Sequence, residues 1–236
     1  MNGGERWCIS AHEGAMNGAE QMRNYTARCP DSHLIVMGFS QGGSVQLDVL
    51  GGGGGELWGC QQEENPAMDI NSAPVVAAAI FGATRRSGNQ NFTFGGGEIS
   101  NGGAPRSTQQ NAGLQPYANA GRLREYCQPR DPICAPQTEN KDMSFHLDYF
   151  DKWGTEAADW VVSKAREADS IKKGVDATSN ASNALKKGIL RLTLIVFLFT
   201  IAISSALFIV KRVLSQKFLR TRYILISNSS ITNTLE

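Results

Sequence analysis

HLIVMGFSQGGSVQLDVL, residues 33–50, joins an apolar run to a serine between glycines and then to a largely apolar segment. The uninterrupted apolar residues 34–37 are typical of a strand buried on both faces of a parallel sheet. Residues 38–42 match Gly-x-Ser-x-Gly, in which the serine occupies a sharp turn between a strand and a helix. Glycine is needed on both sides because neighbouring backbone passes too close for a Cβ. The stretch predicts strand, turn and helix, with Ser40 as candidate nucleophile and with Gln46 and Asp48 on the outer helix face.

The remaining elements alternate in type, which favours a layered α/β domain over a sandwich or a bundle. Ser10 and Glu13 resemble a capping box at the start of a helix. The expected helices cover 10–28 and 154–168, and the expected further strands cover 74–82 and 122–127.

Three segments lack such periodicity. The glycine run 51–55 is not followed by Lys-Ser/Thr, so we interpret it as a helix exit into a mobile loop rather than a phosphate-binding loop. Residues 56–71 are expected to form a polar loop. Residues 89–115 are rich in Gly, Asn, Ser and Gln and predict a long surface excursion.

The C-terminal part differs in character from the rest. Residues 192–210 contain no charged side chain and are flanked by lysines and arginines, which predicts a membrane span. We divide the chain into an esterase-like domain (1–168), a polar stalk (169–188), one transmembrane helix (189–212) and a basic tail (213–236). The basic flank places the C-terminus inside and the domain outside, anchored to the membrane. A glycolipid-anchor signal is the weaker alternative, because residues continue well beyond Val210.

Five cysteines are present, an odd number that leaves at least one outside a disulfide. Cys127 and Cys134 enclose a short loop with two prolines. A zinc site would usually need tighter Cys pairs or nearby histidines, so a disulfide and an oxidising compartment are the better interpretation.

A serine nucleophile needs an imidazole to take its proton and a carboxylate to orient that imidazole. His12 and His33 are expected to lie at the surface or to cap helices upstream of the turn, which leaves His146 as base. Asp131, inside the Cys127–Cys134 loop, is the best-placed acid, because the loop would limit its freedom. The rivals are Asp142, Asp148 and, more weakly, Glu139.

Three motifs occur in this order along the chain: CPDSHLIVMGFSQGG, YCQPRDPIC and FHLDY. With them, the sequence resembles the fungal cutinase and acetylxylan esterase family of serine esterases over about residues 9–168. The resemblance implies a three-layer α/β/α domain with a central parallel sheet, a Cys127–Cys134 disulfide and cofactor-free ester hydrolysis through an acyl-enzyme. It assigns nucleophile, acid and base to Ser40, Asp131 and His146. The family's Gly-Asp-Pro after the second strand is here Gly82-Ala83-Thr84.

The start of the chain departs from this family. Family members have a signal peptide and a first strand upstream of the region matching Ser10, and the loop after that strand supplies an oxyanion-hole donor. We expect this chain to lack both, which leaves the Gln41 N–H as the nameable donor. Cys29, whose family partner is N-terminal, would pair with Cys8 or Cys60 or stay free.

The leading hypothesis is a membrane-anchored extracellular serine esterase acting on acetylated polysaccharide or cutin-type polyester. The partners expected are that polymeric ester and the membrane, and no nucleic acid. A second hypothesis is an impaired, membrane-displayed binding or structural module that arises from truncation. A third possibility is that residues upstream of Met1 complete the domain.

Overall fold

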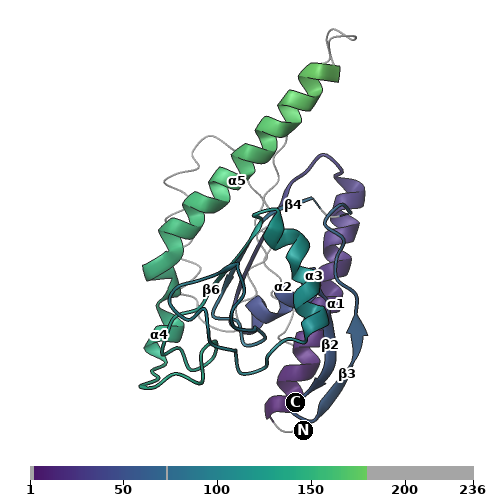
Figure 1. Cartoon of the computed structure of the whole chain (residues 1–236). Helices are drawn as coiled ribbons and strands as arrows, with labels where there is room; N and C mark the ends of the chain where they lie inside the picture. The colour runs from purple at the N-terminus through teal and green to yellow at the C-terminus, as the bar shows by residue number, and fades with distance from the viewer. Residues whose placement is uncertain (1–2, 73, 180–236) are drawn as a thin grey trace, which may run out of the picture.

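A computed structural model describes residues 3–72 and 74–179 of the chain (Figure 1). Its main sheet has four strands in the order β1-β4-β6-β5, and each neighbouring pair is parallel. The three segments predicted as strands form its first three members, and the short β5 joins beside β6. The strands are β1 (Leu34–Phe39), β4 (Val75–Phe81), β6 (Leu123–Tyr126) and β5 (Thr93–Phe94).

Helices cover both faces of this sheet, so the expected three layers are present (Figure 1). One face packs against α1 (Gly3–Arg28), α2 (Gln41–Gly51) and α3 (Thr108–Asn119). The other face packs against α5 (Tyr149–Ser179), which follows the one-turn helix α4 (Ser144–Leu147). Successive strand residues alternate between the two cores: Leu34 and Val36 face the first, whereas Ile35 faces the second.

The helix predicted for residues 10–28 begins earlier, at Gly3. The capping-box interpretation of Ser10 and Glu13 is therefore wrong, because Ser10 lies inside the helix. Its hydroxyl donates to the Trp7 carbonyl oxygen at 3.1 Å, as serine hydroxyls within helices often do.

The glycine run does not lead into a loop. The helix exit at Gly51 is as predicted, but residues 53–65 form an antiparallel hairpin of β2 (Gly53–Leu57) and β3 (Cys60–Asn65) in place of the predicted mobile loop and the first part of the polar loop predicted at 56–71. Residues 66–71 contain no helix or strand, as predicted. The glycines allow this hairpin to lie close to its surroundings. A Cβ on Gly53 would lie 2.5 Å from Asp48 Cγ, and Gly54, at φ +80°, lies against the Glu63 carbonyl.

The predicted excursion at 89–115 also contains regular structure. It includes β5 and the first part of α3, which begins after Ser107. The Ser107 hydroxyl accepts from the Gln110 N–H while the Gln110 side chain accepts from the Ser107 N–H, a capping box that starts the helix despite weak apolar periodicity.

The closing helix is longer than predicted, so residues 169–179 of the expected stalk are helical. The membrane span expected at 189–212 and the tail at 213–236 lie outside the described residues. Within 3–72 and 74–179, no helix is long and apolar enough to cross a membrane.

Candidate active site

Ser40 stands between β1 and α2 in a backbone conformation that few non-glycine residues adopt. Its φ is 55° and its ψ is −121°, and its N–H donates to the Phe81 carbonyl oxygen of β4 at 2.8 Å. A Cβ on Gly38 would lie 2.6 Å from the Gly42 carbonyl oxygen, so the first glycine of the motif is required by close backbone approach. The strained turn lifts Ser40 Oγ above the end of the sheet.

His146 lies beside this serine although 106 residues separate the two. Its Nε2 is 2.9 Å from Ser40 Oγ, within hydrogen-bond distance. The imidazole is almost fully buried in α4 and packs on the Phe39 ring, with 4.8 Å between ring centroids. A proton on Nδ1 would leave Nε2 free to accept the serine proton.

Asp131 completes a continuous line of hydrogen bonds. Its two carboxylate oxygens lie 3.1 and 3.0 Å from His146 Nδ1, and the residue is fully buried. Burial alone would raise the pKa of Asp131, but hydrogen bonds and charge attraction from His146, together with donors from Tyr149 and the Ile133 N–H, outweigh it and lower the pKa. The carboxylate is therefore held ionised beside the imidazole.

Tyr149, which the sequence interpretation did not single out, is the second side chain on that carboxylate. Its hydroxyl donates to Asp131 Oδ2 at 2.7 Å and accepts from the Gln128 N–H at 2.9 Å. Burial and then the charge of Asp131 raise its pKa, so it remains a donor. The signal was its position three residues after His146, one helical turn away.

Gly82, at the end of β4, gives His146 and Tyr149 room to approach the sheet. A Cβ there would lie 2.9 Å from the Tyr149 ring and 3.1 Å from the imidazole, and its φ is +55°. Residues 82–84 differ from the family's Gly-Asp-Pro, but they keep Gly82, the residue that this close approach requires. The following Thr84 N–H donates to the Ser44 hydroxyl at 3.0 Å, which ties this loop to α2.

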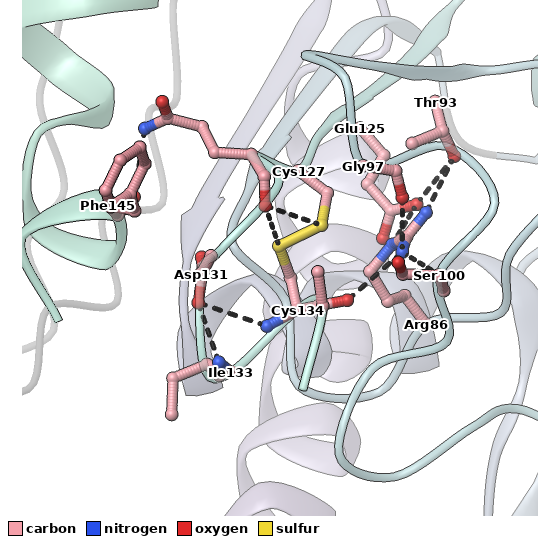
Figure 2. The surroundings of a disulfide bond; sticks show 12 residues. Arg86, Thr93, Gly97, Ser100, Glu125, Cys127, Asp131, Ile133, Cys134 and Phe145 are labelled. Atoms are coloured by element: carbon pink, nitrogen blue, oxygen red, sulfur yellow. Dashed lines mark hydrogen bonds and ion pairs between the residues drawn. A yellow bond between two sulfur atoms is a disulfide. The ribbon is translucent and has the colours of Figure 1, made fainter. Parts of the chain in front are cut away.

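The Cys127–Cys134 disulfide closes the loop that carries Asp131 (Figure 2). Inside it, Asp131 Oδ1 accepts from the Ile133 N–H at 2.7 Å and the Cys134 N–H at 3.2 Å. Behind the loop, the buried Arg86 donates to the Cys134 carbonyl oxygen at 3.1 Å, as Figure 2 shows. Hydrogen bonds therefore hold both the Asp131 carboxylate and the end of the loop that carries it.

The rival residues lie in other environments. Asp148 accepts from Gln128 Nε2, and Asp142 and Glu139 are exposed. Asp142 accepts from the Ser144 N–H at 2.8 Å, a local turn contact. The other histidines also lie elsewhere: His33 precedes β1 at the end remote from Ser40, 3.6 Å from Asp169, and His12 lies half-buried in α1.

Gln41 opens α2 directly after Ser40. No side chain caps the start of α2, so no cap occupies the N–H groups of its first turn. The Gln41 side chain donates to the Trp7 carbonyl oxygen at 3.1 Å and to Ser10 Oγ at 2.8 Å, which fixes the residue against α1. This environment suits the expected use of the Gln41 N–H as a donor to an oxyanion.

Two disulfides are formed in total. The second joins Cys8 in α1 to Cys60 in β3, and Cys29 remains free. Of the alternatives open for Cys29, the structure therefore selects the unpaired one.

Comparisons with known proteins agree with this architecture. The chain is 28% identical over 165 residues to acetylxylan esterase 2 of Talaromyces purpureogenus, covering 69% of this chain and 65% of that protein. It is 26% identical over 184 residues to the acetylxylan esterase of Hypocrea jecorina, covering 76% and 56%. Cutinase 11 of Verticillium dahliae is 24% identical over 172 residues, covering 71% and 54%. The chain thus spans about half to two thirds of the length of these relatives.

The fold is likewise similar to solved structures. The catalytic core domain of the acetyl xylan esterase from Trichoderma reesei superposes with a TM-score of 0.54 at 23% identity, covering 67% of this chain and 72% of that one. The family model described as Cutinase matches residues 4–165, which is more than half of the chain. The chain belongs to the cutinase family.

Proposed function

We propose that this chain is a serine carboxylic ester hydrolase in which Ser40 is the nucleophile, His146 the general base and Asp131 the residue that orients the base. The observation that carries the proposal is the unbroken line from Ser40 Oγ through His146 to Asp131, with 2.9 and 3.0 Å steps. Relatives named as esterases support the same reaction class.

In the proposed reaction, Ser40 Oγ attacks the ester carbonyl carbon while its proton passes to His146 Nε2. The carbonyl oxygen becomes an oxyanion facing the Gln41 N–H. When the tetrahedral intermediate collapses, the C–O bond to the alcohol breaks and the alcohol takes the proton from His146. Water then repeats the sequence on the acyl-enzyme, releasing the acid and restoring Ser40.

The proposed substrate is a small acyl group, such as acetyl, on a polysaccharide. The similarity to proteins named acetylxylan esterases supports this choice over a polyester. Within residues 87–106, most side chains are small or polar, so this segment offers little aliphatic surface for a long acyl chain.

A Ser40→Ala variant tests the proposal. We expect it to lose about 10⁴-fold or more of kcat on p-nitrophenyl acetate and of acetate release from acetylated xylan. Ser163→Ala, on the outer part of α5, is the matched control and should retain wild-type rates.

Covalent labelling distinguishes an active enzyme from an impaired module. A fluorophosphonate should add to the wild-type protein on the peptide that contains Ser40 and not to Ser40→Ala. A folded wild-type protein that is neither labelled nor active would contradict the proposal and support the alternative of an impaired binding module.

A further inference from the structure

Trp58 occupies the turn of the β2–β3 hairpin in a conformation that does not suit it. Trp58 and Gly59 are the two turn residues between Leu57 and Cys60, with φ values of 51° and 79°. A two-residue turn with two positive φ values favours Asn-Gly, and a bulky aromatic residue at its first position is an outlier. The indole is nevertheless 45% exposed.

The fold does not depend on this indole to close the hairpin. The Gly59 N–H donates to Glu56 Oε1 at 2.7 Å, and Cys60 is cross-linked to Cys8 of α1. Leu57 and Cys60 supply the buried contacts of this end of the hairpin. Backbone strain at a half-exposed aromatic side chain is a reason to look for a role in binding.

The two residues beside the ring, Trp7 and Gly103, are hydrogen-bonded to the segments that hold the proposed nucleophile and acid. On one side the Trp58 ring contacts the Trp7 ring, with 5.2 Å between centroids, and the Trp7 carbonyl oxygen accepts from the side chain of Gln41, the neighbour of Ser40. On the other side, Trp58 Cζ2 lies 3.9 Å from the Cβ position of Gly103. The Gly103 N–H donates to the carbonyl oxygen of Ile133, two residues after Asp131.

Small and polar groups lie beside the exposed part of the ring, whereas its inner part lies next to the apolar cluster of Leu57 and Trp7, and the Glu56 carboxylate accepts from the Gly59 N–H at the same turn. Gly103 and the Thr84 methyl group lie together on one side, since that methyl is 3.5 Å from the same Cβ position. Gln61, exposed, and Gln62, half-buried, follow the turn on β3. An exposed flat ring with a carboxylate at its turn and amide side chains on the adjoining strand suits a pyranose ring, whose C–H face is apolar and whose edge carries hydroxyls that these groups could bind. It suits an acyl chain less well, because such a chain needs an enclosed apolar groove.

We propose that Trp58 is a stacking platform for a sugar unit of the polysaccharide whose ester group reaches Ser40. The inference rests on the proposed esterase function and adds a binding subsite to it. Trp7 packs against Trp58 with the two ring planes 60° apart, and the Cys8–Cys60 disulfide ties the hairpin to α1.

Trp58→Asn is the sharpest test, because the Asn-Gly pair that the turn favours offsets the lost contact with the Trp7 ring, so the variant should remain folded. We expect the ratio of kcat/KM on acetylated xylan to kcat/KM on p-nitrophenyl acetate to fall about tenfold, the effect of losing one stacking contact. Trp58→Tyr keeps an aromatic face and should stay within about threefold of the wild type. Met16→Asn, which removes an equally exposed apolar side chain from α1, should leave the ratio unchanged.

Two results would overturn the platform: an unchanged ratio, whether or not both rates fall, or a larger loss on polycaprolactone than on xylan, which would indicate an acyl-chain site. A wild-type protein that cleaves p-nitrophenyl acetate but not acetylated xylan would instead contradict the proposed substrate. In that case, binding of xylohexaose tests whether Trp58 is a stacking platform. The Ser40→Ala variant should bind xylohexaose about tenfold more tightly than the Ser40→Ala/Trp58→Asn variant. Equal affinities would overturn the inference.

Discussion

Asp131 is held by two side chains that lie one helical turn apart. His146 contacts both of its oxygens, and Tyr149 donates to Oδ2. The Tyr149 hydroxyl also accepts from the Gln128 N–H, so its orientation is fixed by the loop that it serves. We therefore regard Tyr149 as a positioning residue that acts on the proposed mechanism through Asp131.

Tyr149→Phe should lower kcat on p-nitrophenyl acetate about tenfold and destabilise the fold by about 1.5–3 kcal/mol, because a hydrogen bond to a buried carboxylate is lost. The same bond helps to hold the pKa of Asp131 low, so its loss raises that pKa. The acidic limb of the kcat/KM–pH profile should accordingly move to higher pH.

Tyr126→Phe is the matched control, because it removes another hydroxyl bonded to a carboxylate, that of Glu156 at 2.6 Å. It should reduce stability without moving the pH profile. If both variants shift the profile equally, or neither does, Tyr149 has no positioning role.

At the scale of elements, the two disulfides constrain different parts of the molecule. The Cys127–Cys134 bond closes a separation of 7 residues around Asp131, whereas Cys8–Cys60 spans 52 residues and joins α1 to the hairpin. Chain-entropy arguments assign about 4 kcal/mol to the longer loop and about 2.5 kcal/mol to the shorter one.

Replacing each pair by alanine should therefore separate stability from turnover. Cys8→Ala/Cys60→Ala should lose more free energy of unfolding in urea titrations. Cys127→Ala/Cys134→Ala should lose more kcat per folded molecule on p-nitrophenyl acetate, because the acid loop gains freedom. The reverse order of kcat losses would show that the short loop does not position Asp131.

The sequence predicted those elements whose signal is local. The strands β1, β4 and β6 are confirmed, and for β1 and β4 the reason is that continuous apolar runs identify buried parallel strands without knowledge of their neighbours. The sequence did not predict the β2–β3 hairpin. Its glycines are needed because Asp48 and Glu63 approach them closely, and this approach is visible only in the folded chain. The sequence named Ser40, Asp131 and His146 as candidates because histidines are few and the motifs occur in a recognisable order, and the structure places the three side chains within hydrogen-bond distance of one another in a line.

At the scale of the whole molecule, a buried charge network joins α2, the loop after β4 and the start of α3. Asp48, predicted to face outward, is 2% exposed and pairs with Arg85 at 3.2 Å and with Arg106. The two arginines also donate to the carbonyl oxygens of Gly54 and Gly52 at the base of the hairpin. The outward prediction was wrong because both partners lie far along the sequence.

Asp48→Asn should destabilise the protein by about 3–5 kcal/mol, because it leaves two buried guanidinium groups without their carboxylate. Burial already lowers the pKa of Arg106, and Asp48 is the main influence that opposes this shift. Urea unfolding measures the loss. Glu167→Gln, which breaks an exposed pair with Lys164, is the control and should cost far less, because solvent screens that pair. Equal costs for the two variants would contradict a structural role for the network.

The first residue of α5 gives the longest described helix an unusual start. Helix ends commonly fray, and their amide protons exchange readily with solvent. Here the terminal residue is Tyr149, whose hydroxyl is bonded to Asp131, so the first turn cannot unwind without releasing a side chain from the buried carboxylate. Slow amide exchange at this helix end would therefore report directly on the integrity of the Ser40 site in the resting protein.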